Sequence, residues 1–206
     1  MVILVLIALL EMIHLNKILY VVDSNCKKNY HYDITSDTII YHFSINSSVQ
    51  VDINIVNENV NLYYYYNNIN YDDNSFSIQV HHLNSSTHSE LYIHGVNVSQ
   101  NKLNYNIQGI VPKMYSNCIC NQENQIINLD SGKSTICPIL KIDNYNVDSN
   151  HSAFIGKFSE EKIFYMMSRG ITRKNAYRLL LNGFLINSDS IDTSKIVEFT
   201  NEIKKI

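Results

Sequence analysis

The feature that most constrains this chain is the region from Asp23 to Phe158, where short runs of alternating apolar and polar residues follow one another without a helical period. The run Val51–Ile55 is typical, because its odd-numbered residues are apolar and its even-numbered residues are polar. Runs of about five to seven residues have the length of ordinary strands. We therefore expect a mainly β domain with strands near residues 18–23, 38–43, 49–56, 60–66, 76–83, 90–98, 102–111, 126–129 and 140–142.

The connections between these runs limit the architecture. No Asn-Gly or Asp-Gly dipeptide, the usual sign of a tight hairpin, occurs between Asp23 and Phe158. Asn and Ser are common at the bends instead, and Asn tolerates the left-handed backbone conformation that sharp corners need. The pattern fits the stacked coils of a β-solenoid, and a β-sandwich remains the alternative because no exact repeat is present.

From Phe158 onward the chain changes to helical patterns. Ser159 is placed to cap a first helix whose apolar stripe would be Ile163, Phe164, Met166 and Met167, and Gly170 suits its left-handed end. Thr172 would cap a second helix that buries Ala176, Tyr177, Leu179, Leu180 and Leu181 and is closed by Gly183. A third helix is expected over residues 192–203.

These patterns divide the chain into an apolar N-terminal segment (1–22), a β core (23–157) and a C-terminal helical domain (158–206). The apolar run Val2–Leu10 is too short to span a bilayer, which takes about 20 residues. No Lys or Arg precedes it and no small-x-small cleavage site follows it, so we expect a packed helix or strand, or the remnant of a longer region. A secretory signal is the alternative.

Charge gives little support for nucleic-acid binding, since the formal net charge is −3. The residues from Lys157 onward hold nine Lys or Arg and six Asp or Glu, whereas the remainder is acidic. This basic tail could meet an acidic partner or could be a solvated surface. The four cysteines, Cys26, Cys118, Cys120 and Cys137, lack zinc-finger spacing and are expected to be free thiols, with a metal role for Cys118, Cys120 or Cys137 as the alternative.

Other candidate chemistry is sparse. On a strand, His82, His88 and His94 would share one face, which suggests either a metal patch or ordinary polar-face residues. The run Tyr63–Tyr66 should alternate between the two faces of a strand. Neither a glycine-rich phosphate loop nor a nucleophile elbow is present in the sequence, which agrees with a protein that is not an enzyme.

One segment carries a family resemblance. Its pattern begins with Pro138-x-Leu140-x-Ile142 and passes through Val147 and His151 to Gly156. It continues with Ser159–Tyr165, the turn Ser168–Ile171, and Ala176, Leu179, Leu180 and Phe184, while Gln122-x-Asn124 precedes it. In this combination and order the segment resembles the SufB/SufD family of iron–sulfur cluster assembly proteins, and it is more SufD-like than SufB-like.

The resemblance implies a right-handed parallel β-helix followed by a small helical domain. It implies a non-catalytic scaffold that pairs with a SufB-type subunit and docks a SufC-type ATPase through its C-terminal helices. No tightly bound cofactor is expected, although a transient iron–sulfur cluster would form at the subunit interface. The implied location is the cytoplasm, or the stroma of a plastid, with neither membrane nor nucleic acid as a partner.

The resemblance also nominates site residues. His151 would be an iron–sulfur ligand or an interface residue, or else a structural residue of the last coil. Ser149 stands where family members commonly have Cys, and Ser is a poor ligand for iron. The expected partner-binding residues are Phe164, Tyr165, Arg169, Gly170 and Phe184. For the three aromatic residues the competing interpretation is core packing, and for Arg169 it is hydrogen bonding to local carbonyls.

Two other functions stay open at this point. A secreted or surface β-solenoid that binds glycans or a protein would explain the apolar start and the Asn-x-Ser sequences at Asn46, Asn84, Asn97 and Asn150. A small helix-turn-helix DNA binder over residues 163–184 rests only on Gly170 and the basic tail.

Overall fold

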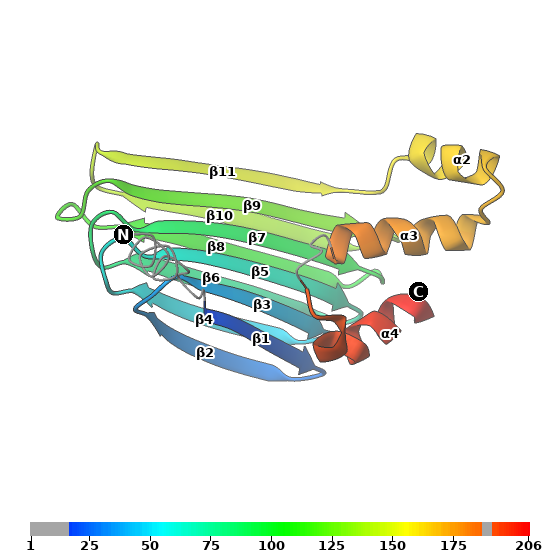
Figure 1. Ribbon diagram of the computed structural model, residues 1–206. Coiled ribbons are helices and arrows are strands. Elements are labelled where there is room, and N and C mark those ends of the chain that lie inside the picture. Colours follow the sequence, from blue (N-terminus) through cyan, green and yellow to red (C-terminus); the bar gives the residue numbers. More distant parts are fainter. Residues whose placement is uncertain (1–16, 187–190) are drawn as a thin grey trace, which may run out of the picture.

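The computed structural model describes residues 17–186 and 191–206, so the predicted apolar run Val2–Leu10 lies outside the described residues (Figure 1). The strands follow one another along the chain and are joined by short corners. They are β1 (Lys17–Ser24), β2 (Lys27–Ile34), β3 (Thr38–Ile45), β4 (Ser48–Ile55), β5 (Asn61–Asn70), β6 (Asn74–His82), β7 (His88–Asn97), β8 (Lys102–Val111), β9 (Cys118–Asn128), β10 (Lys133–Ile142) and β11 (Val147–Gly156).

These strands form a solenoid with two faces. Odd-numbered strands make a six-stranded sheet in the order β1-β3-β5-β7-β9-β11, and even-numbered strands make a five-stranded sheet in the order β10-β8-β6-β4-β2. Each neighbouring pair is parallel, for example Lys17 opposite Thr38 and Lys27 opposite Ser48. The solenoid expectation is therefore confirmed, and the sandwich alternative, whose sheets are antiparallel, is wrong.

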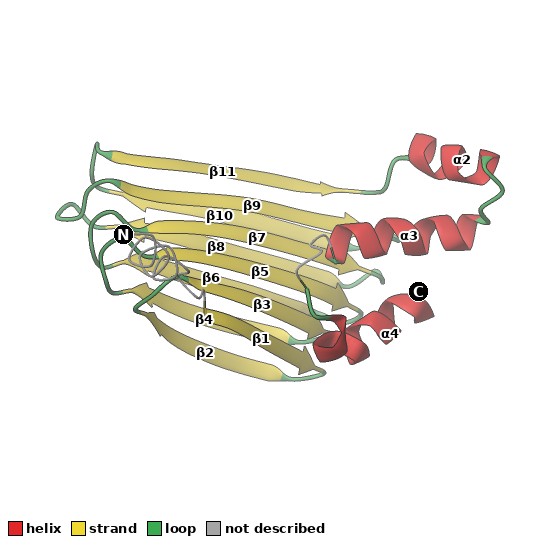
Figure 2. Ribbon diagram, in the orientation of Figure 1, coloured by secondary structure: helices red, strands yellow, loops and turns green. Residues whose placement is uncertain are grey.

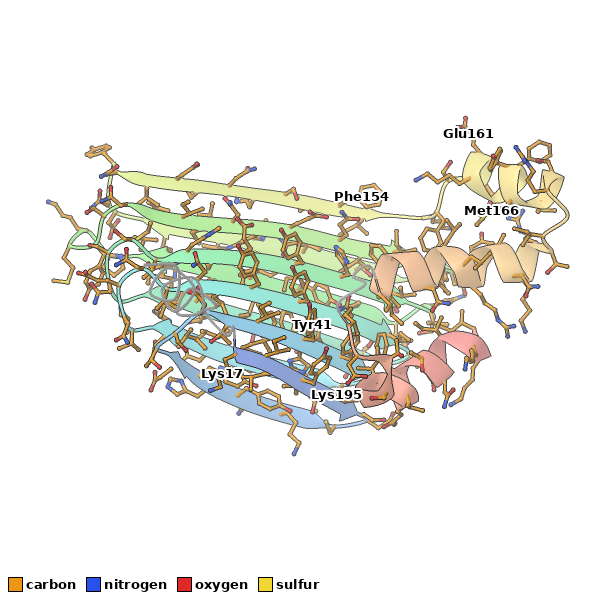
Figure 3. The ribbon with its side chains drawn as sticks, viewed as in Figure 1. Lys17, Tyr41, Phe154, Glu161, Met166 and Lys195 are labelled. Carbon is orange, nitrogen blue, oxygen red and sulfur yellow. The ribbon has the colours of Figure 1, made fainter. Side chains whose placement is uncertain are left out.

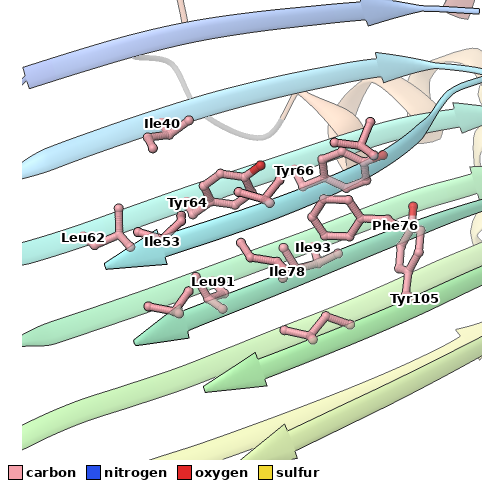
Figure 4. Packing of buried hydrophobic residues seen from close by; sticks show 14 of the residues in the cluster. Ile40, Ile53, Leu62, Tyr64, Tyr66, Phe76, Ile78, Leu91, Ile93 and Tyr105 are labelled. Atoms are coloured by element: carbon pink, nitrogen blue, oxygen red, sulfur yellow. The ribbon is translucent and has the colours of Figure 1, made fainter. Parts of the chain in front are cut away.

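The alternating pattern explains the core between the two sheets. Val51, Ile53 and Ile55 of β4 point inward and are at most 1% exposed. In β5, Tyr64 and Tyr66 are completely buried whereas Tyr63 and Tyr65 lie on the outer face, so the predicted alternation of this run is confirmed. Figure 4 shows Tyr64, Tyr66, Phe76 and Tyr105 packed together inside the solenoid.

The corners show why Asn is so common in this chain. Asn25, Asn46, Asn59 and Asn117 all adopt positive φ angles, as does Ser86. In addition, the Oδ1 atom of Asn46 accepts hydrogen bonds from the backbone N–H groups of Tyr71 (3.2 Å) and Asp72 (3.0 Å) on the next coil. Asn thus supplies both the corner conformation and a hydrogen bond between coils, as expected for a residue that tolerates the left-handed region.

The C-terminal region is helical, with α2 (Glu160–Ser168), α3 (Arg173–Leu185), the 3-10 turn η1 (Thr193–Ile196) and α4 (Val197–Lys205) (Figure 2). Thr172 caps α3 by accepting a hydrogen bond from the N–H of Asn175, and Gly170 has a φ of 86°, both as expected. The prediction that Gly183 ends the second helix is wrong, because α3 continues to Leu185.

The helices α3 and α4 pack on the outer face of the six-stranded sheet. Leu181, Leu185, Phe199 and Ile203 form a second core with Tyr41, Phe43, Ile45, Ile69, Val96 and Ile127 of the strands. Figure 1 shows both helices near the C-terminal ends of these strands, with α2 projecting beyond them. The helical region is therefore anchored to the solenoid through α3 and α4.

Two predicted strands need correction. Residues 140–142 are only the end of β10, and residues 126–129 overlap only the end of β9. Pro138–Ile142 lies in β10, the last strand of the five-stranded sheet, and β11 follows it and pairs with β9. The solenoid ends at Gly156, within the expected β core (23–157), although no strand was predicted over residues 147–156.

Candidate functional site

The C-terminal end of the solenoid presents a free sheet edge. β11 and β10 are the last strands in their sheets, so each has a neighbour on one side only among the described residues. Along β11, Phe154 is 50% exposed and Ile155 is 41% exposed. Figure 3 shows Phe154 projecting from the outermost strand of this end. An exposed edge with unpaired backbone groups is suited to pairing with a strand of another chain.

His151 lies in the middle of this edge strand. It is paired in register with Gln122 of β9, whose side chain faces the solenoid interior, and so it shares that face. Its own side chain is exposed because no further coil covers it within the described residues. The imidazole is thus accessible at the open end, and its role as a metal ligand stays a prediction.

The nearest cysteines are buried below this end. Ser149 is paired with Cys120, and burial raises the pKa of the Cys120 thiol to about 11. Cys118 is also interior and accepts a hydrogen bond from the hydroxyl of Thr87 at 3.3 Å. A neutral buried thiol is a poor metal ligand. In the described ranges, no group of three or more His, Cys, Asp or Glu side chains is arranged to hold a metal ion.

A second exposed region is the helical arm, which we define as α2, the turn 169–172 and the first turns of α3. Only Ile163 of α2 is buried. Phe164 is 73% exposed, Tyr165 is 59% exposed, and Leu179 of α3 is 49% exposed. The interpretation of Phe164 and Tyr165 as core residues is therefore wrong. The arm presents large apolar side chains to solvent.

Arg169 lies beside these aromatic residues. Its guanidinium group donates a hydrogen bond to the hydroxyl of Tyr165 at 3.1 Å and lies 5.1 Å from the centre of that ring. The alternative that Arg169 bonds to local carbonyls is therefore not supported by its side-chain contacts. Arg173 donates to both carboxylate oxygens of Glu160, at 2.7 and 2.9 Å, and so links α3 to α2. Because its guanidinium group lies against the ring of Tyr165, Arg169 adds a positive charge to the exposed aromatic surface.

The turn between α2 and α3 borders a hollow of about 450 Å³. Its lining residues are Gly170, Ile171, Thr172, Asn175, Arg178 and Leu179. The left-handed conformation of Gly170 allows the sharp reversal that brings these residues together.

Phe184 belongs elsewhere. Its ring stacks on His94 of β7 with 4.7 Å between the ring centres, and its backbone carbonyl accepts a hydrogen bond from His94 Nδ1 at 3.1 Å. Phe184 therefore helps to attach α3 to the sheet, as part of the second core. The structure separates it from the exposed side chains of the arm, although it was expected among the partner-binding residues.

The predicted histidine face is not formed. His88 and His94 lie on the outer face of β7, but His82 ends β6 and points into the solenoid, where its ring contacts the hydroxyls of Thr87 (2.7 Å) and Ser89 (2.9 Å). Burial lowers the pKa of His82 to about 4, so its ring is neutral at pH 7. The period-two count failed because a corner separates the two strands.

Sequence reasoning missed a buried polar network at the other end. His42 Nε2 lies 2.8 Å from the carboxylate of Asp23, and the hydroxyl of Tyr30 lies 2.7 Å from the same carboxylate. The hydroxyl of Tyr64 lies 2.7 Å from the other ring nitrogen, His42 Nδ1. Burial opposes ionisation of Asp23, but hydrogen bonds from His42 and Tyr30 outweigh it and lower its pKa. Burial lowers the pKa of His42, so with Asp23 ionised the neutral ring carries its proton on Nε2 and Tyr64 donates to Nδ1. The spacing from 23 to 42 gives no signal of this contact.

Within the described residues, no helix has both the length and the apolar character needed to cross a bilayer.

Comparison with known proteins agrees with this geometry. The family model for the SUF system FeS cluster assembly, SufBD core domain, matches residues 20–184. The chain is similar to the iron–sulfur cluster assembly protein SufD of Bacillus subtilis, with 30% identity over 112 residues, which is 54% of this chain and 26% of that protein. It is also similar to the SufBD family protein ycf24 of Porphyra purpurea, with 25% identity over 118 residues, 56% of this chain and 24% of that protein.

A third relative, a SufBD family protein of Archaeoglobus fulgidus, is 43% identical over 56 residues, or 27% of this chain and 15% of that protein. The matched region thus spans about a quarter or less of the length of these relatives. The family model, in contrast, covers most of the chain, including nearly all of the solenoid, α2 and most of α3. The chain therefore belongs to the SufBD core domain family of the SUF iron–sulfur cluster assembly system.

Proposed function

We propose that this chain is a SufD-like, non-catalytic scaffold subunit for iron–sulfur cluster assembly. It would pair with a SufB-type subunit through the free edge at β11 and dock a SufC-type ATPase through the helical arm. Membership of the SufBD core domain family supports a role in the SUF iron–sulfur cluster assembly system. The similarity to the SufD of Bacillus subtilis supports the SufD-like assignment.

The observation that carries the proposal is the surface of the helical arm. Phe164, Tyr165 and Leu179 are each about half exposed or more, although exposed large apolar residues on one short helix pair are costly unless a partner covers them. Arg169 lies against the ring of Tyr165, and Arg173 is paired with Glu160 of the same arm. The arm therefore favours a partner whose surface is apolar at its centre and acidic at its rim.

The free edge supports the second contact. β11 offers unpaired backbone groups together with Phe154 and Ile155, and pairing with a partner strand would satisfy the groups and cover the side chains. His151 would then lie at the junction of the two subunits. Since no complete ligand set occurs in the described part of this chain, His151 would supply one ligand to a transient cluster, and the partner would supply others.

Co-purification tests the docking assignment. The chain is expressed with a SufC-type ATPase and a SufB-type subunit, and the variant Phe164→Asp/Arg169→Glu is compared with the wild type. We expect the variant to retain SufB pairing and to lose at least tenfold in affinity for the ATPase, because it places negative charge in the centre of the arm.

A matched control changes an exposed apolar residue and a lysine elsewhere. Val197→Asp/Lys204→Glu on α4 alters the charge by the same amount, and Val197 is 53% exposed. This control should bind the ATPase normally. Normal ATPase binding by the Phe164→Asp/Arg169→Glu variant would show that the arm is not the docking surface.

A secreted or surface β-solenoid that binds glycans or a protein, and a DNA-binding helix pair, were the alternatives. No structural observation on the described residues favours either of them over the scaffold.

A further inference from the structure

The interior of the last coils contains an amide oxygen without a partner. Gln122 of β9 is only 4% exposed, and its Nε2 atom donates a hydrogen bond to the carbonyl of Ile139 at 3.3 Å. Its Oε1 atom is buried and accepts no hydrogen bond from the described residues. An unsatisfied buried acceptor costs free energy, so such an atom calls for a physical explanation.

The strand register identifies which side chain can reach this oxygen. Gln122 is paired with Leu91 of β7 on one side and with His151 of β11 on the other. Partners in adjacent parallel strands lie about 4.8 Å apart, with their side chains on the same face of the sheet. Leu91 has no polar side-chain atom. Of the two ladder neighbours, only His151 carries an N–H group that can be donated to Oε1.

His151 has the freedom to make this contact. Its side chain is exposed on the last strand and makes no hydrogen bond with the described residues in the present rotamer. Exposed side chains change rotamer in picoseconds to nanoseconds, so the ring samples orientations toward its neighbour. A hydrogen bond to a buried acceptor would favour one of them.

We propose that Gln122 is a positioning residue for His151. Its Oε1 accepts a hydrogen bond from one ring nitrogen of His151, which fixes the tautomer of the imidazole. The other nitrogen then keeps its lone pair and faces out of the free edge, where it can bind a metal ion or accept a hydrogen bond. Histidines that bind metals are commonly oriented in this way by a second hydrogen bond. The biological use of this geometry rests on the proposed scaffold function, but the contact itself does not.

Asn124 provides an internal comparison. Its Oδ1 atom is also buried without a partner, and its Nδ2 atom donates to the carbonyl of Ser152 at 3.0 Å. Its ladder neighbour on β11 is Ala153, which has no side-chain donor. Replacing Asn124 therefore removes a buried amide of β9 and its hydrogen bond to β11 without removing an acceptor from His151.

The test is nitrogen-15 NMR of the histidine rings in this chain, with the His151 signals assigned by comparison with His151→Gln. In the wild type we expect a single predominant tautomer of neutral His151. In Gln122→Leu we expect the tautomer mixture of a free imidazole. Gln122→Glu, which keeps an acceptor oxygen at the same reach, should restore the single tautomer, and Asn124→Leu should leave it unchanged.

The outcomes separate the alternatives. A wild-type His151 with the free-imidazole mixture would overturn the proposal and would leave water as the partner of Gln122 Oε1. The same change in Asn124→Leu as in Gln122→Leu would also overturn it, because loosening of β11 would then be the cause. If Gln122→Leu does not fold, Gln122→Met, closer in length, replaces it. None of these readouts needs the SufB or SufC partner, so failure of the proposed function would appear separately, in the co-purification.

Discussion

The solenoid and the helical arm use apolar side chains in opposite ways. Inside the solenoid, Tyr64, Tyr66 and Phe76 are at most 1% exposed and pack among strands from both sheets. On the arm, Phe164 and Tyr165 are more exposed than buried, and Ile163 is the only buried residue of α2. The first group stabilises the fold, whereas the second group faces solvent and adds little to the core. Apolar character in the sequence therefore does not tell whether a side chain is buried or exposed.

The largest expected effect comes from emptying the solenoid core. Phe76 is 1% exposed and stacks on Tyr66 with 3.7 Å between ring centres. Phe76→Ala should lower the free energy of unfolding by about 3–5 kcal/mol, because it removes buried area and leaves a cavity. Urea denaturation, monitored by circular dichroism, measures this change in the free energy of unfolding. A loss below about 1 kcal/mol would show that the interior is not closely packed.

Acid should weaken the solenoid through His82. Its pKa is about 4 in the folded chain and about 6.5 when unfolded, so the unfolded chain binds the extra proton between these values. The stability that the neutral His82 ring contributes is therefore fully present above pH 6.5. It falls by about 2–3 kcal/mol as the pH drops toward 4. Denaturation at pH 7 and pH 4.5 should show a smaller drop for His82→Gln than for the wild type. Equal drops would assign the acid sensitivity to other groups.

The corner residue Asn46 should have an intermediate effect. Asn46→Ala removes an acceptor for two backbone N–H groups and puts Ala, which tolerates the left-handed region less well than Asn, at a φ of 47°, so a loss of about 1–3 kcal/mol is expected. Asn46→Gly relieves the backbone strain and should recover part of the loss. If the two variants are equally unstable, the hydrogen bonds alone account for the role of Asn46.

The smallest effect on stability should come from the arm. Phe164→Ala is expected to change the free energy of unfolding by less than about 0.5 kcal/mol, because the side chain is 73% exposed. The same variant should weaken binding of a SufC-type ATPase, measured by calorimetry, since exposed aromatic residues are common hot spots. A large loss of stability with unchanged binding would reverse the comparison between arm and solenoid.

Much of the solenoid could be predicted from local patterns. The alternation in Val51–Ile55 and the Tyr63–Tyr66 run placed side chains correctly inside and outside, because a strand repeats every two residues. Asn at the corners and Gly170 after α2 were expected from their tolerance of positive φ, and the backbone angles confirm it. The family resemblance, in turn, favoured the solenoid over the sandwich.

The sequence-based predictions that were wrong or missing concern contacts between segments that are distant in the sequence. His82 was grouped with His88 and His94 because counting by twos ignores the corner that moves the chain from one sheet to the other. Phe164 and Tyr165 read as core because an amphipathic helix shows an apolar stripe whether it faces the same chain or a partner. Strand register decides that Asp23 meets His42 and that Gln122 lies beside His151. The alternation of apolar and polar residues along a strand does not determine this register.

Hydrogen–deuterium exchange of the chain with and without a SufC-type ATPase shows whether the helical arm is the docking surface. We expect slow exchange in the inner strands in both states, and fast exchange over residues 160–172 that becomes slow only when the ATPase is bound. Protection that appears on the outer face of the five-stranded sheet instead, with the arm still exchanging fast, would contradict it.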